Sequence, residues 1–181
     1  MGLLDMAGEV IDTLGGPISS IAKRVFMDQV SPVPGCVVRA DICLGLSSHT
    51  GIYVGGDTII EITDVDGEAM VRSVTPSEFL NGGETRTGAY IYVAASERGD
   101  EMYALGCEDI ARRARQALGS RGKYFTLCNN CHQFTRYCIL GEDDEDSTPW
   151  TVDDIVEALK SKFGVEDVYW RCAEDYFQCY S

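Results

Sequence analysis

The chain has 181 residues, of which 45% are hydrophobic and 24% charged, and 29 acidic against 15 basic residues give a formal net charge of −14. This composition is typical of one folded domain and excludes a disordered chain. The charge opposes binding to nucleic acid, because few Lys or Arg side chains remain to displace phosphate counterions. No apolar run reaches the roughly 18 residues of a membrane helix, and the first residues do not resemble a secretory signal. We therefore expect a cytoplasmic protein, with leaderless export left open.

Residues 1–32 predict two short amphipathic helices, interrupted at Gly15-Gly16-Pro17. Their polar positions carry more acidic than basic side chains, which disfavours an anionic membrane surface. We expect these helices to pack on the main body, with peripheral contact to a membrane as the alternative.

Residues 33–141 are expected to form the main domain. The first half of this segment is rich in β-branched residues and predicts strands at about 36–40, 49–54, 58–63, 69–71 and 88–93. Gly55-Gly56-Asp57 is interpreted as a three-residue turn, and Thr75-Pro76 as the start of a short helix. The pattern predicts a largely antiparallel sheet.

Helices dominate the rest of the chain. A long helix is predicted from Met102 to Leu118, and a second one from Cys131 to Gly141, with Asn130 as its N-cap. Residues 142–181 are expected to be an extension that begins with a solvated acidic linker at 142–146. A helix from Thr151 to Phe163 and a closing strand near 168–170 are predicted there, and they look like an appendage.

The stretch TLCNNCHQF, residues 126–134, has three interpretations. Cys128-x-x-Cys131-His132 is the spacing of covalent haem attachment, and Cys128 with Cys131 is also the spacing of a redox dithiol. In the third interpretation Cys131 is a lone nucleophile. The other six cysteines include no second close pair, so we expect no zinc site and no other cofactor.

A nucleophilic cysteine at position 131 fits the predicted helix. With Asn130 as the N-cap, Cys131 is the first helical residue, where unpaired N–H groups and the helix dipole favour a thiolate. A base is also required, and the chain has two histidines. His132 lies about 100° around the helix from Cys131, so His49 is the better candidate.

Glu61 is the predicted partner of His49. A three-residue turn places His49 opposite Thr63 and Glu61 opposite Gly51, so the two side chains lie on one face as a diagonal pair about 7 Å apart. Gly51 is expected to leave the space between them open. A carboxylate there can hold the imidazole in one tautomer and orientation. A turn of two or four residues would instead put Glu61 on the opposite face, and a solvated Glu61 is the alternative.

Two segments carry a resemblance to a known family. HTGIYVGGDTIIEI, residues 49–62, and YFTLCNNCHQFTRYC, residues 124–138, resemble the lecithin retinol acyltransferase-like thiol enzymes, which show His-x-Gly-Ile-Tyr-x-Gly early and Asn-Cys-x-x-Phe late. The resemblance covers about residues 34–141. It implies an α+β, circularly permuted papain-like fold. In that fold an antiparallel sheet carries the histidine and packs against helices, with the cysteine at a helix N-terminus.

The resemblance also implies roles for the site residues. Cys131 is similar to the family's nucleophile and His49 to its general base. Glu61 stands where members commonly have a second histidine, although related permuted bacterial members use Glu there. His132 stands where many members have Glu, and we interpret it as incidental. The implied reaction is acyl transfer through a thioester on Cys131, with the Cys131 backbone N–H in the oxyanion hole.

The implied partner is an acyl-bearing small molecule, a lipid or a peptide. An ester, phospholipid-like or otherwise, and an amide stay open as substrates, as do hydrolysis and transfer to an acceptor. A dithiol redox protein that uses Cys128 and Cys131 is one alternative, and covalent haem is another. A non-catalytic interaction domain of the same fold is the third.

Overall fold

The computed structural model of the chain describes residues 29–42, 47–65, 67–82, 86–123, 127–141 and 151–173. Within them the strands are β1 (Gln29–Val30), β2 (Val37–Ile42), β3 (Ser47–Gly55), β4 (Thr58–Val65), β5 (Glu68–Val74), β6 (Arg86–Arg98), β7 (Glu101–Ala104), β8 (Arg121–Lys123) and β9 (Tyr169–Ala173). The helices are α3 (Pro76–Asn81), α4 (Glu108–Gln116), α5 (Leu127–Leu140) and α6 (Val152–Phe163). Of residues 1–32, where two amphipathic helices are predicted, residues 1–28 lie outside the described residues, as does the acidic linker, and Gln29–Val30 form strand β1.

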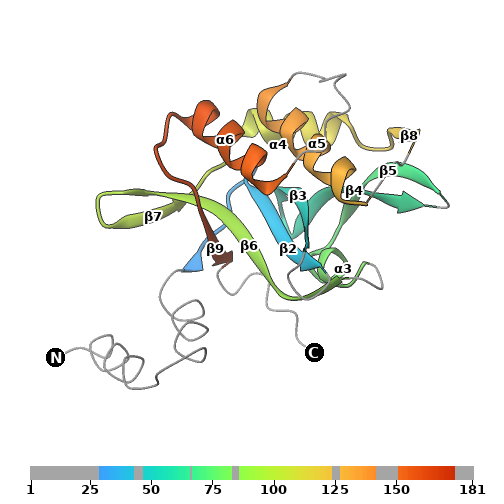
Figure 1. Ribbon diagram of the computed structural model, residues 1–181, viewed down its shortest axis with the longest axis horizontal. Helices are drawn as coiled ribbons and strands as arrows, with labels where there is room; N and C mark the ends of the chain where they lie inside the picture. The colour runs from blue at the N-terminus through green and yellow to red at the C-terminus, as the bar shows by residue number, and fades with distance from the viewer. Residues whose placement is uncertain are drawn as a thin grey trace.

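The strands form one sheet in the order β1-β9-β6-β2-β3-β4-β5-β8, and β7 pairs with β6. Neighbouring strands run antiparallel except β1 and β9, which run parallel. Helices α4, α5 and α6 cover one face of the sheet, and α3 lies on the other side (Figure 1). The predicted mixed α+β class with a largely antiparallel sheet is confirmed.

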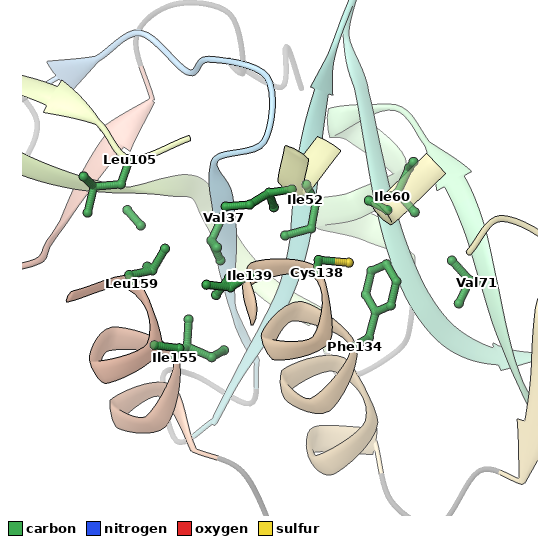
Figure 2. Packing of buried hydrophobic residues seen from close by; sticks show 14 residues of the cluster. Val37, Ile52, Ile60, Val71, Leu105, Phe134, Cys138, Ile139, Ile155 and Leu159 are labelled. Atoms are coloured by element: carbon green, nitrogen blue, oxygen red, sulfur yellow. The ribbon is translucent and has the colours of Figure 1, made fainter. Parts of the chain in front are cut away.

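Each face of the sheet has its own core. The larger core lies under the helices, where Phe134, Cys138 and Ile139 of α5 and Ile155 and Leu159 of α6 face strand residues that include Val37, Ile52 and Ile60 (Figure 2). The second core joins strand residues of the opposite face, such as Tyr53 and Ile59, to Phe79 and Leu80 of α3. Successive strand residues alternate between the two cores, as the pleat requires.

The hairpin between β3 and β4 has the predicted register with a different turn. Gly56 and Asp57 alone form the loop, both with positive φ (58° and 57°), and Gly55 pairs with Thr58. A register shift between Tyr53 and Gly55 adds one residue to β3, so that Ile52 still pairs with Ile60. A two-residue loop without a bulge would put the preceding side chains of β3 on the opposite face of the sheet. The extra residue of the bulge returns them to the predicted face. The expected three-residue turn is therefore wrong, but the register inferred from it is right.

The helix predicted from Met102 is wrong over its first part. Residues 101–104 form β7, which pairs back onto the end of β6 through a tight turn at Gly99 (φ 63°). Glycine adopts this conformation without steric cost, so the chain reverses there and extends a strand pair before helix α4 begins. Helix α4 carries two acidic residues in its first turn, which its dipole favours.

The predicted C-terminal elements are present and are integrated into the fold. Thr151 and Asp154 form a capping box at α6, and Gly164 ends the helix in the left-handed conformation. Ile155 and Leu159 are fully buried in the larger core, and β9 pairs with both β6 and β1. In the structure this segment completes the sheet and the core, so it is not an appendage; the division of the chain at residues 32 and 141 stays a prediction.

Candidate active site

His49 of β3 and Glu61 of β4 contact each other inside the protein. The distance from His49 Nε2 to Glu61 Oε2 is 2.7 Å, and the exposed fractions of the two residues are 1% and 0%. The bulged hairpin puts both residues on the face of the sheet that α3 covers. The predicted contact between these two side chains is confirmed.

Arg72 of β5 completes this group, and the sequence analysis missed it. Its Nε and Nη2 atoms lie 3.0 and 2.9 Å from Glu61 Oε1. Arg72 is directly opposite Glu61, because β4 and β5 are joined by a tight hairpin in which Val65 pairs with Glu68. The sequence signal was the Asp66-Gly67 dipeptide, which is typical of two-residue hairpins and fixes this register.

The hydrogen bonds indicate the protonation state of the group. Oε1 of Glu61 accepts two N–H groups from a guanidinium, which favours an ionised carboxylate. An ionised carboxylate can only accept hydrogen bonds, so the proton in the contact with Oε2 belongs to Nε2 of His49. Nδ1 is then the nitrogen of His49 that can accept a proton from another group.

Phe79 of α3 packs against the ring of His49. The two ring centroids are 5.1 Å apart, and the planes are inclined by 38°. A Cβ atom on Gly51 would lie 2.9 Å from Cγ2 of Ile59 and 3.1 Å from Cε2 of Phe79. The backbone carbonyl oxygen of Ile60 would lie 2.9 Å from the same Cβ atom. The space expected to stay open beside Gly51 is therefore filled by Ile59, Ile60 and Phe79.

Cys131 lies on α5, farther into the helix than predicted. The helix begins at Leu127, so Asn130 is not its N-cap and Cys131 is the fifth helical residue. Asn130 is a good N-cap by type, but that local preference is worth only about 1 kcal/mol and does not fix a helix start. At the fifth position a regular helix bonds the backbone N–H to the carbonyl four residues earlier. Because this N–H is used within the helix, the expectation that it forms part of an oxyanion hole is wrong.

The side chain of Cys131 is fully buried and does not take part in a disulfide bond. The side chain of Cys128 lies outside the described residues. His132 is also buried, with 5% of its surface exposed, and lies near Ser48. It therefore lies in the interior between α5 and β3. The sequence analysis, which interpreted His132 as incidental, did not anticipate this burial.

Strand β3 presents its residues alternately to α5 and to α3. The hydroxyl groups of Thr50 on β3 and Thr135 on α5 are 3.0 Å apart, whereas the neighbouring His49 stacks on Phe79 of α3. Helix α5 also packs against β4, the strand of Glu61. Cys131, the nucleophile proposed from the sequence, thus lies on a helix that contacts both β3 and β4. This helix covers the face of the sheet opposite to the face that carries His49 and Glu61.

Two further cysteines have environments that suppress their reactivity. Burial raises the pKa of the Cys36 thiol to about 12, and burial likewise raises the pKa of the Cys138 thiol to about 12. Thiols of this kind carry essentially no thiolate at neutral pH and act as small hydrophobic groups.

The comparison with protein families agrees with this arrangement. The sequence model of the lecithin retinol acyltransferase family matches residues 35–144, which is more than half of the chain and includes His49, Glu61 and Cys131. The chain belongs to the lecithin retinol acyltransferase family. Members of this family are thiol acyltransferases and phospholipases that act on lipid or acyl substrates. No curated protein matches the chain closely enough to count as a relative.

Two other properties bear on the chemistry of this family member. Among the residues that the structure describes, no three His, Cys, Asp or Glu side chains are grouped so that they could hold a metal ion. None of the helices α3 to α6 combines the length and the apolar character needed to cross a bilayer.

Proposed function

We propose that this protein is a cysteine-dependent acyltransferase or hydrolase that forms a thioester between Cys131 and the acyl group of its substrate. The observation that carries the proposal is the buried hydrogen bond of 2.7 Å between His49 and Glu61. An imidazole oriented by a carboxylate is the arrangement that activates nucleophiles in enzymes of several unrelated folds. The substrate is an ester of the phospholipid type or an amide, in keeping with the lipid and acyl substrates of the family.

In the proposed reaction, Nδ1 of His49 accepts the thiol proton of Cys131 while Glu61 stabilises the imidazolium through Nε2–H. The thiolate attacks the carbonyl carbon, and the imidazolium gives its proton to the leaving oxygen or nitrogen as that bond breaks. A thioester remains on Cys131. Water or an acceptor alcohol or amine then loses a proton to His49 as it attacks the thioester, and the thiol is restored.

The relation of α5 to β3 supports an encounter at one end of the strand. Thr135 contacts Thr50, and His132 lies near Ser48, so Cys131 on the preceding turn is level with the first residues of β3. His49 is the third residue of that strand. We propose that the encounter takes place at this end of the strand, with the Cys131 sulfur moving toward the His49 ring while the ring keeps its hydrogen bond to Glu61.

The experiment is an intact-mass measurement after the reduced protein is incubated with phospholipid vesicles and, separately, with acylated peptides. The proposal predicts an acyl adduct on the wild type that is absent from Cys131→Ala. His49→Gln should slow its formation by about 10²–10⁴-fold, the usual contribution of a general base. The mass of the adduct identifies the acyl group.

Cys128→Ser is the matched control for this experiment, since it removes the neighbouring thiol of the same helix. It should leave adduct formation nearly unchanged. Loss of activity in Cys128→Ser, with disulfide reductase activity in the wild type, would replace the proposal by a dithiol function. If neither substrate class gives an adduct on Cys131, the protein is better described as a non-catalytic interaction domain of the same fold.

A further inference from the structure

Arg72 connects the buried His49–Glu61 pair to the protein surface. Arg72 contributes two N–H groups to one oxygen of Glu61, and the other oxygen of Glu61 contacts Nε2 of His49. The side chain of Glu61 has no exposed surface, whereas that of Arg72 is 34% exposed. Each carboxylate oxygen thus has its own neighbour, and the three side chains form a chain from solvent to the interior.

Among the described residues, few other charges lie near these three side chains. From β2, Ala40 pairs with His49, and Thr63, two residues after Glu61 on β4, is a buried polar residue. Helix α3 contributes Phe79 and one carboxylate, Glu78, whose charge reaches both Arg72 and Glu61. Arg72 is a cation in direct contact with the buried carboxylate, so its removal changes the charge felt by His49.

We propose that Arg72 is a positioning residue for the base. It keeps Glu61 ionised and aims Oε2 at Nε2 of His49, which fixes the proton on Nε2 and leaves Nδ1 to serve as the base. The consequence for catalysis rests on the proposed function, but the effect of Arg72 on the His49 ring can be measured without any substrate.

The geometry explains why the residue is an arginine. Nε and Nη2 belong to one rigid planar group and both donate to Oε1, while Oε2 contacts Nε2 of His49, so the two contacts together define the orientation of the carboxylate. A lysine ammonium would supply the same charge, but its flexible side chain would not fix the orientation of the carboxylate. Arg72→Lys therefore separates the effect of charge from that of orientation.

The first experiment is nitrogen-15 NMR of the imidazole groups in the full chain. The chain has two histidines, so His132→Gln assigns both signals. The wild type should show His49 as the Nε2–H tautomer. Arg72→Met should give a mixture of tautomers and should raise the pH at which the His49–Glu61 pair takes up a proton by about one unit, because a nearby positive charge is lost.

Arg72→Lys should keep the protonation close to that of the wild type but still mix the tautomers. It also guards against poor folding of Arg72→Met, because it retains the charge opposite Glu61. Arg121→Met is the matched control. It removes an arginine of β8 that forms an exposed ion pair with Glu68, a residue of the same strand as Arg72. An unchanged His49 tautomer and titration in both Arg72 variants would overturn the proposal.

The second experiment measures turnover of whichever substrate acylates Cys131. Arg72→Met should lower kcat by about 10- to 100-fold with little change in KM, and Arg72→Lys should recover part of this loss. In a Glu61→Gln background, Arg72→Met should have little further effect, because the arginine acts through Glu61. Equal losses in both backgrounds would contradict the positioning role.

The two experiments separate this inference from the proposed function. A changed His49 tautomer in Arg72→Met without acylation of Cys131 by any substrate would refute the thiol mechanism alone. Acylation that depends on His49 with an unchanged tautomer in the Arg72 variants would refute the role of Arg72 alone.

Discussion

Thr50 and Thr135 join strand β3 to helix α5 through hydroxyl groups that are 3.0 Å apart in a fully buried contact. One residue belongs to the strand that carries His49, and the other lies one helical turn after Cys131. This contact therefore fixes the position of the cysteine helix along the histidine strand.

We predict that Thr50→Val and Thr135→Val each destabilise the protein by about 1–3 kcal/mol, because each leaves the other hydroxyl group buried without its hydrogen bond. The double variant should be less destabilised than the sum of the two, since both polar groups are then removed. Urea unfolding of the four proteins measures this coupling. Additive free energies of unfolding would show that the two hydroxyl groups are not partners.

A methyl group at Gly51 should disturb the site through Phe79. In Gly51→Ala the added Cβ would lie 2.9 Å from Ile59 Cγ2, 2.9 Å from the backbone oxygen of Ile60 and 3.1 Å from Phe79 Cε2, so both strand β4 and the ring that packs on His49 must shift. We expect a loss of about 1–3 kcal/mol in the free energy of unfolding, as for other overpacked cores. Gly56→Asn is the control, because that position has open space and a φ of 58° that asparagine tolerates. It should be nearly neutral.

The capping box of α6 should make stability depend on pH. The backbone N–H and hydroxyl group of Thr151 donate to Asp154 and hold the pKa of its carboxyl group below the ordinary 3.8. A depressed folded pKa contributes stability above the unfolded value of about 4, and this contribution is lost as the pH falls further. The difference in unfolding free energy between the wild type and Asp154→Asn should thus be largest near neutral pH and shrink below about pH 4.

Asp153→Asn is the control for this titration, because it makes the same change in the same helical turn outside the capping box. It shows how much of the effect of Asp154→Asn comes from the loss of one negative charge near the helix N-terminus. A difference for Asp154→Asn that stays constant between about pH 6 and pH 3 would contradict the shifted pKa.

Cys36 and Cys138 should resist alkylation in the folded protein. Burial raises the pKa of each thiol to about 12, so neither forms a reactive thiolate at neutral pH. Peptide mass mapping after iodoacetamide treatment at about pH 8 should find both unmodified, and both should be labelled once urea unfolds the chain. Modification of either residue in the native protein ahead of Cys131 would contradict this assignment.

The local sequence determined much of the fold. The abundance of β-branched residues predicted β2, β3 and β4, and the Thr-x-x-acid pattern predicted the starts of α3 and α6, because strand propensity and helix capping are properties of neighbouring residues. The shared face of His49 and Glu61 was predicted from a three-residue turn; the structure has a two-residue loop and a bulge instead, which give the same register. The family was also recognisable, since its two motifs are contiguous in the chain.

Other features depended on contacts between distant segments. The start of α5 at Leu127 differs from the position that Asn130 indicates, because a cap contributes less than the packing of a whole helix. Residues 101–104 pair with β6 although their composition also fits a helix. Arg72 reached Glu61 only through the pairing of β4 with β5, a register that the sequence analysis did not work out.

The sequence by itself predicted which residues carry the proposed chemistry, because the capacity to act as nucleophile, base or carboxylate partner is a property of side-chain type and of short motifs. Only the tertiary structure decided how they are held: Phe79 fills the space beside Gly51, Arg72 neutralises the buried Glu61, and α3 and α5 approach β3 from opposite sides. The physical reason is that burial and charge pairing depend on segments far apart in the chain, which no local pattern records.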